Sequence, residues 1–176
     1  MLKMAVAALA FVAVLPWAAS AHGPTRQKVV QSIEINAPAD KVWAAIGKFQ
    51  DMSWHPAIAK TEGPGDNATG AKRILTLKSG GTIEEALTAY NGDAKSYGYE
   101  ITTVDVKTLP VTNYSSSIRV SGEGAKSTVE WKGAFYRGFV NNDPPPELSD
   151  EAGVAAVMGV YKAGLEALKA KLEAGG

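Results

Sequence analysis

The sequence predicts an α+β fold in which a curved antiparallel sheet of six to seven strands wraps around one long C-terminal helix, with two short helices after the first strand. Between residues 72 and 137, β-branched and aromatic runs alternate with Gly, Asn and Asp turn signals, which is typical of a meandering antiparallel sheet. After residue 149, apolar side chains recur at spacings of three and four, which indicates a helix with one apolar face. A sheet and a helix of this kind bury their apolar faces by packing together.

The first 21 residues are expected to be a cleaved export signal. Lys3 supplies a positive start, Met4 to Leu15 is apolar throughout, and Ala19-Ser20-Ala21 offers the small residues that a signal peptidase requires. A retained anchor is the alternative, but the apolar run is shorter than the roughly 20 residues that span a bilayer. The sequence therefore predicts a periplasmic protein without a stable membrane anchor.

Signal cleavage before His22 would leave a short polar lead, residues 22–27, and one helix-and-sheet domain over residues 28–176. The formal net charge of the whole sequence is zero, which argues against a nucleic acid as partner. The sequence has no cysteine, so disulfides, thiolate metal sites, cysteine nucleophiles and a c-type haem are all excluded. No cofactor is expected.

The N-terminal half of this domain is expected to begin with a strand over Val29–Ile35, where β-branched residues predominate. A helix should follow from Pro38 to Phe49, because apolar side chains recur there at helical spacing and a proline suits the first helical position. Ser53–Ala59 is expected to form the second short helix or a turn, broken by Pro56. Glu62–Lys72 concentrates Gly, Pro, Asp and Asn and should be a loop.

Further strands are each expected to end at turn residues, and they cover Lys72–Leu77, Thr82–Tyr90, Ser96–Thr103, Thr112–Ser121 and Ser127–Arg137. Three prolines then stiffen the connection "NNDPPPELSDE". Ser149 is a suitable N-cap for the last helix, and Gly175-Gly176 should end it. Its apolar face is expected to comprise Val154, Val157, Met158, Tyr161, Leu165, Leu168 and Leu172.

This order of elements resembles the helix-grip superfamily, which includes START and Bet v 1-like proteins and the SRPBCC polyketide cyclases. The stretches that carry the resemblance are "APADKVWAAIGKF", "WHPAI", "EEALTAY", "VEWKGAFY" and "YKAGLEALKAKL", within residues 28–174. The resemblance implies a helix-grip fold. A sheet wrapped around a helix often leaves a cavity between the two, open at one end.

Other stretches resemble the MxaD family of periplasmic proteins from the methanol-oxidation gene clusters of methylotrophic bacteria: "AHGPT", "WHP", "LPVTNYS", "EWKGAFYRG", "PPPELSDEA" and "AGLEALK". This resemblance implies a non-catalytic accessory role, assisting contact between methanol dehydrogenase and its c-type cytochrome electron acceptor. Its contact surface would lie around "FVNNDPPPELSDE" and the "WHP" rim. One alternative is a carrier of a small apolar ligand. A cyclase-like enzyme, using groups such as Tyr99 or Glu85, ranks last because few acid–base groups converge.

Aromatic and polar side chains on the expected inner face are the candidates for lining or rimming a ligand cavity. Tyrosines among apolar residues are typical of small-molecule sites, and equally of a filled core. The candidates are Trp54, His55, Glu85, Tyr97, Tyr99, Tyr114, Trp131, Phe135 and Tyr161.

His55 has three interpretations: a general base, a metal ligand or a structural corner. We expect the corner, with Trp54 and Pro56 wedging the turn at the pocket rim, because no second histidine stands at a metal-ligand spacing. A copper site made by His55 with an N-terminal His22 is the sharper alternative. No catalytic residue and no metal site are expected.

Glu84 and Glu85 should point to opposite faces of their strand, because side chains alternate along a strand. Glu85 matches a Glu-x-Leu pattern of the helix-grip superfamily and is therefore the better candidate. We expect a solvent-exposed pair at an edge or rim. The alternative is a buried carboxylate with a raised pKa or one paired with a base such as Arg137.

Overall fold

A computed structural model describes residues 23–174, so the expected export signal lies outside the described residues. The chain forms one seven-stranded sheet in the order β1-β7-β6-β5-β4-β3-β2, antiparallel throughout. The predicted α+β architecture is confirmed. The elements are β1 (Gln27–Ile35), α1 (Ala39–Ile46), β2 (Ile58–Glu62), β3 (Lys72–Leu77), β4 (Thr82–Asn91), β5 (Ser96–Val104), β6 (Val111–Ser121), β7 (Ser127–Arg137), η1 (Pro146–Leu148) and α2 (Asp150–Glu173).

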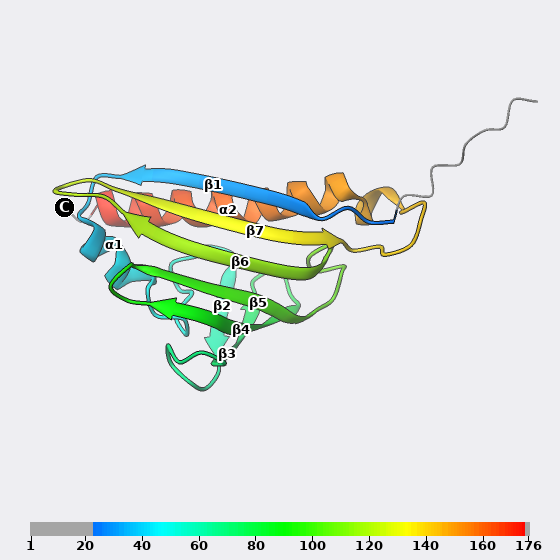
Figure 1. Ribbon diagram of the computed structural model, residues 1–176, viewed down its shortest axis with the longest axis horizontal. Coiled ribbons are helices and arrows are strands. Elements are labelled where there is room, and N and C mark those ends of the chain that lie inside the picture. Colours follow the sequence, from blue (N-terminus) through cyan, green and yellow to red (C-terminus); the bar gives the residue numbers. More distant parts are fainter. Residues whose placement is uncertain (1–22, 175–176) are drawn as a thin grey trace, which may run out of the picture.

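The long helix α2 packs chiefly against β1 and β7. Figure 1 shows α2 running alongside these two strands, while the segment between β7 and α2 extends beyond the end of the sheet. The first and last strands of the chain pair with each other, with Gln27 opposite Phe135 and Ile35 opposite Ser127. This pairing brings the two ends of the domain together and leaves β1 and β2 as the edges of the sheet.

The inner face of the sheet is the apolar one, as the alternating pattern predicts. Along β7, Val129, Trp131 and Phe135 are buried, whereas Thr128 and Lys132 at alternate positions are exposed. The same alternation holds along β6. The buried faces of the sheet, α1 and α2 form a single core, which is the helix-grip arrangement.

Two features near the first helix differ from the prediction. Ser53–Ala57 forms turns and no helix, with His55 N–H donating to the Met52 carbonyl and Ile58 N–H to the His55 carbonyl. Pro56 has no N–H, so the repeating bonds of an α-helix cannot pass through it. The strand β2 follows at once and was not predicted, because its short, charged sequence carries little apolar alternation.

The start of α2 is confirmed. The Ser149 hydroxyl accepts a hydrogen bond from the Ala152 N–H at 3.2 Å, and Asp150 and Glu151 occupy the first turn. The helix ends at Glu173, and the expected stop at Gly175-Gly176 lies outside the described residues. Within residues 23–174, no helix combines the length and the apolar character that crossing a membrane requires.

Candidate functional site

A cavity of about 90 Å³ lies between the inner face of the sheet, the turns at residues 52–58 and α2. Apolar side chains make most of its wall, and a few polar groups interrupt them. The lining residues are Met52, His55, Ala57, Ile58, Leu75, Leu77, Ile83, Glu85, Tyr99, Ile101, Thr108, Leu109, Tyr114, Trp131 and Val160. An apolar cavity with a few polar groups is the usual form of a small-molecule site.

A buried ion pair closes one side of this cavity. Arg73 on β3 donates from Nε to Glu85 Oε2 at 2.6 Å, and the two side chains are 1% and 5% exposed. Arg73 also donates from Nη1 to the Phe49 carbonyl at 2.6 Å, and its guanidinium lies over the Phe49 ring at 4.1 Å from the centroid. The guanidinium is therefore held by a carboxylate, a carbonyl and an aromatic face.

The expectation that Glu84 and Glu85 form an exposed pair is wrong for Glu85, while Glu84 is exposed on the other face. Arg137 is not the partner of Glu85. It lies at the far end of β7, where its Nη1 donates to Asp150 Oδ2 at 3.2 Å. The actual partner, Arg73, stands opposite Glu85 in the β3–β4 register, and that pairing depends on strand register.

Burial changes the pKa values of the titratable groups around the cavity. The pKa of Glu85 is raised because burial disfavours the charged carboxylate, and the Arg73 guanidinium opposes this in part. Burial is the largest single influence on the pKa of Arg73 and lowers it, but the Glu85 carboxylate, Tyr97 and Tyr99 together raise this pKa above its ordinary value. Burial also raises the pKa of the inner tyrosines Tyr97, Tyr99 and Tyr114, and it raises that of Tyr161 to about 12. These hydroxyls therefore stay neutral at physiological pH.

A hydrogen-bonded network joins the tyrosines to Trp131. Trp131 Nε1 donates to Tyr99 Oη and to Ser116 Oγ, both at 3.0 Å. Tyr161 Oη lies 2.6 Å from Tyr114 Oη and 3.0 Å from Ser116 Oγ. Ser116 Oγ also donates to the Lys132 carbonyl at 2.6 Å, so this serine is the centre of the network. Sequence reasoning missed Ser116, because a single serine in a strand carries no signal for such a role.

Gly133 makes the network sterically feasible. A side chain at this inward-facing position of β7 would collide with the Tyr161 hydroxyl. Because the position is glycine, the Tyr161 ring can stack on Trp131 with centroids 4.3 Å apart and planes 12° from parallel. The network thus fills the middle of the sheet–helix space with aromatic rings, which leaves only the small cavity beside it.

His55 forms a buried corner that joins the turns at residues 52–58 to α2. Its Nε2 donates to the Val160 carbonyl at 3.0 Å, and its Nδ1 accepts from the Ala57 N–H at 3.2 Å. These partners select the neutral ring with its proton on Nε2. Burial lowers the pKa of His55, and the bond to Val160 opposes this less strongly. Both ring nitrogens are thereby engaged by backbone.

This geometry agrees with a structural corner, but His55 is only 2% exposed and does not stand at an exposed rim. Within residues 23–174, no group of three or more His, Asp or Glu side chains could hold a metal ion. His22, the second member of the alternative copper site, lies outside the described residues.

The structure divides the candidate lining residues into two groups, and all of them are buried. One group reaches the cavity itself: His55, Glu85, Tyr99, Tyr114 and Trp131. The other group packs in the core behind it: Trp54, Tyr97, Phe135 and Tyr161. Sequence reasoning missed most of the aliphatic wall, since single Leu and Ile side chains carry no signal that separates a cavity wall from a filled core.

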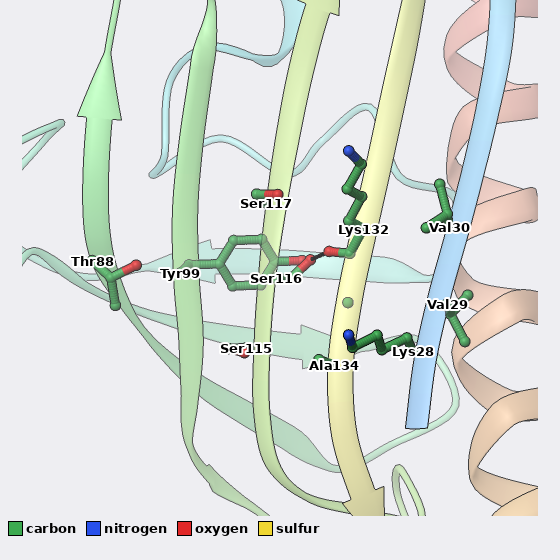
Figure 2. Close-up of a pocket in the computed structure, with 11 residues that line it drawn as sticks. Lys28, Val29, Val30, Thr88, Tyr99, Ser115, Ser116, Ser117, Lys132 and Ala134 are labelled. Atoms are coloured by element: carbon green, nitrogen blue, oxygen red, sulfur yellow. Dashed lines mark hydrogen bonds between the residues drawn. The ribbon is translucent and has the colours of Figure 1, made fainter. Parts of the chain in front are cut away.

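A second, shallow hollow of about 330 Å³ lies on the outer face of the sheet. Figure 2 shows Lys28, Val30, Ser117 and Lys132 around it, on neighbouring strands. These side chains are exposed, and the Lys132 ammonium lies 2.7 Å from Glu130. Tyr99 is the buried titratable side chain among the residues that line this hollow, and it also reaches the inner cavity. Glu85 and His55 reach the inner cavity and are absent from the lining of the hollow, so the inner cavity is the better candidate site.

Residues 26–173 match the family model described as polyketide cyclase/dehydrase and lipid transport. The chain belongs to this family. The described fold has the helix-grip arrangement, with a seven-stranded antiparallel sheet packed against a long C-terminal helix. No curated protein matches the sequence.

Solved structures agree with this membership. An uncharacterised protein from Bacillus thuringiensis is 32% identical with a TM-score of 0.69, and the match covers 83% of this chain and 98% of that one. Protein XoxI from Bacillus cereus is 33% identical with a TM-score of 0.68, and the match covers 82% and 94% of the two chains. Norcoclaurine synthase from Thalictrum flavum, in complex with dopamine and hydroxybenzaldehyde, has a TM-score of 0.63 at 16% identity over 85% and 87% of the two chains, which shows the fold alone.

Proposed function

We propose that this protein is a non-catalytic accessory protein, exported to the periplasm, that assists contact between methanol dehydrogenase and its c-type cytochrome. The resemblance of its sequence to the MxaD family supports this role. The observation that carries the proposal is the filled interior: the cavity of about 90 Å³ is far smaller than the roughly 300–1,000 Å³ of ordinary small-molecule sites. A lipid or polyketide does not fit in this cavity, so we assign the function to the protein surface.

The chemistry around the cavity also supports a non-catalytic role. A general acid or base works best when its pKa lies near the working pH and a proton can reach it. The Glu85 carboxylate is engaged by Arg73, and both nitrogens of His55 are engaged by backbone. The neighbouring Tyr99 and Tyr114 have pKa values well above the ordinary one. No group in this set is therefore poised to transfer protons.

The segment between β7 and α2 is the contact surface that fits this role best. Arg137 holds it from inside, donating from Nε to the Phe139 carbonyl and from Nη2 to the Asn141 carbonyl, each at 2.8 Å. Val140 in this segment is 55% exposed. A segment that is already ordered loses less conformational freedom on binding a partner. Trp54 and His55 are buried and are not offered as contacts, which corrects the expected role of the "WHP" rim.

The test is methanol-dependent reduction of the cytochrome in periplasmic extract from a strain that lacks this gene. Purified protein from residue 22 onwards is added back over a range of concentrations. We expect the rate of reduction to rise with the amount of protein. If the rate stays unchanged while dehydrogenase and cytochrome are each active alone, the accessory role is rejected.

Two exposed valines supply matched variants for this assay. Val140→Arg changes the proposed contact segment, and Val30→Arg changes β1, where the valine is similarly exposed at 53%. We expect Val140→Arg to weaken the stimulation and Val30→Arg to leave it near the unmodified level. Equal effects of the two substitutions would exclude this segment as the contact.

Binding of a small ligand is the second candidate function. The observation that favours it is the cavity itself, which is apolar over most of its wall and reached by Glu85 and Tyr99. A ligand there would be much smaller than a lipid. The two functions are compatible, since one uses the surface and the other the interior.

A further inference from the structure

Two polar groups in the cavity wall each lack one hydrogen-bond partner. The Oε2 atom of Glu85 accepts from Arg73, but its Oε1 atom has no partner among residues 23–174, although the side chain is only 5% exposed and lines the cavity. Because Glu85 lines the cavity, a donor for this oxygen can come from a molecule inside the cavity. The positive charge of Arg73, 2.6 Å away, favours the ionised form of Glu85, and in that form Oε1 is an acceptor.

The hydroxyl of Tyr99 is complementary to this acceptor. It accepts a hydrogen bond from Trp131 Nε1 at 3.0 Å, and the oxygen that could accept its own proton within the described residues, Tyr114 Oη, is 3.5 Å away. That distance exceeds the usual range for two hydroxyls, roughly 2.5–3.0 Å. The Tyr114 hydroxyl is instead paired with Tyr161 at 2.6 Å. The Tyr99 proton is therefore free to donate into the cavity.

Glu85 and Tyr99 stand close together on the inner face of the sheet. Glu85 pairs with Ile101, and Leu87 pairs with Tyr99, so the two side chains are diagonal neighbours on β4 and β5. Such neighbours are within reach of long side chains. The Glu85 charge also contributes to the raised pKa of Tyr99, after burial. The described residues show no direct hydrogen bond between them, which leaves an acceptor and a donor facing one small space.

We propose that the cavity binds a small neutral alcohol, whose hydroxyl donates to Glu85 Oε1 and accepts from Tyr99 Oη. A single hydroxyl group has both capacities, so it completes both hydrogen bonds at once. The apolar wall, including Leu75, Ile83 and Leu109, receives the hydrocarbon part. This inference deepens the second candidate function and does not depend on the accessory role.

The size and charge of the cavity further restrict the chemical class of the ligand. At about 90 Å³ the cavity is far below the roughly 300–1,000 Å³ of ordinary small-molecule sites, so we expect an alcohol of about three carbon atoms to fit. An ammonium group is disfavoured because Arg73 already neutralises Glu85, and a further buried charge would be uncompensated. A carboxylate would be repelled by Glu85. A ligand this small binds in the millimolar range.

The test is a titration followed by NMR of the isoleucine and leucine methyl groups, using 1-propanol, methoxyethane and propylammonium. Methoxyethane matches the size of 1-propanol but cannot donate a hydrogen bond. We expect 1-propanol to cause saturable shifts at Ile83, Ile101 and Leu109, which line the cavity. We expect methoxyethane to bind about tenfold more weakly, the usual effect of one lost hydrogen bond, and propylammonium more weakly still.

Two tyrosines on β5 supply matched variants. Tyr99→Phe removes the hydroxyl that reaches the cavity, while Tyr97→Phe removes one that is equally buried but does not line it. We expect about tenfold weaker binding of 1-propanol to the first variant and unchanged binding to the second.

Several outcomes would overturn the proposal. These are shifts that do not saturate, methoxyethane or propylammonium binding as tightly as 1-propanol, or the two variants behaving alike. If Tyr99→Phe unfolds the protein, the ratio of the dissociation constants of methoxyethane and 1-propanol for the unmodified protein still tests the proposal. None of these measurements involves methanol dehydrogenase, so failure here and failure of the accessory role are separate results.

Discussion

Gly164 is the point where α2 comes closest to the buried corner at His55. A methyl group on this residue would lie 2.5 Å from His55 Cδ2, 2.9 Å from His55 Nε2 and 3.1 Å from Trp131 Cζ3. Carbon atoms in good contact are about 3.5–4.0 Å apart. Neither ring can move away freely, because His55 is bonded to Val160 and Trp131 is stacked on Tyr161. Gly164→Ala must therefore displace the corner or the helix.

The net effect follows from three contributions to the free energy of unfolding. Replacing Gly by Ala inside a helix stabilises it by about 0.8–1 kcal/mol. Overpacking a filled core costs about 1–3 kcal/mol. Loss of the hydrogen bond from His55 Nε2 to the Val160 carbonyl costs about 0.5–1.5 kcal/mol. We expect Gly164→Ala to be destabilising by roughly 1–3 kcal/mol.

Gly159 on the same helix is the matched control. A methyl group there meets nothing within 4 Å, so only the helix contribution remains, and Gly159→Ala should stabilise by about 0.5–1 kcal/mol. Urea unfolding followed by circular dichroism at 222 nm measures both, and the two variants should shift the midpoint in opposite directions. If Gly164→Ala is as stable as Gly159→Ala, His55 is not packed against α2 as described.

Three other substitutions or conditions test the buried polar groups and the helix cap. Arg73→Met should lower the free energy of unfolding by about 3–5 kcal/mol, because it leaves the Glu85 carboxylate buried without a countercharge, and Arg73→Met with Glu85→Leu should recover most of the loss in urea unfolding. As the pH is lowered from about 7 to 5, the free energy of unfolding should decrease by at most about 1.4 kcal/mol per pH unit. The reason is that burial lowers the pKa of His55 in the folded protein below 6.5, so the unfolded chain takes up the proton first. His55→Gln should remove that slope in a urea series at several pH values, with little loss at pH 8. Ser149→Ala should cost about 1 kcal/mol in the same assay, through loss of the bond from Ala152 N–H.

Each of these expectations has an outcome that contradicts it. A double Arg73 and Glu85 variant no more stable than Arg73→Met would mean that the pair is not the origin of the loss. A pH slope that persists in His55→Gln would assign it to other groups. A Ser149→Ala variant of unchanged stability would mean that the N-cap bond is replaced by water.

Much of the secondary structure could be read from local sequence. The bounds of β3 and β7 agree with the prediction, because alternation of buried and exposed side chains is a property of neighbouring residues. The N-cap at Ser149 was likewise predicted from residues within one turn of it. The edge strand β2 was missed, since Lys60 and Glu62 give it no apolar face to recognise.

The candidate site was predicted only in part. Tyr99, Tyr114 and Trp131 were assigned to the inner face, where they lie, because their positions follow from strand period. The predicted environment of Glu85 was wrong, since its burial and its partner depend on which strand pairs with β4 and in which register.

The sequence by itself determined most of the strands, the long C-terminal helix and the helix-grip arrangement that joins them. It missed β2, and Met158, which was expected on the apolar face of α2, is 42% exposed. The properties that the sequence determined follow from the periods of the two regular structures, 2 and about 3.6 residues, which act over a few residues. Only the tertiary structure decided the size of the cavity, the pairing of Arg73 with Glu85 and the burial of His55 against Gly164. Each of these depends on how side chains distant in the sequence fill one shared volume, because interiors are close-packed and a single ring or methyl group changes what space is left.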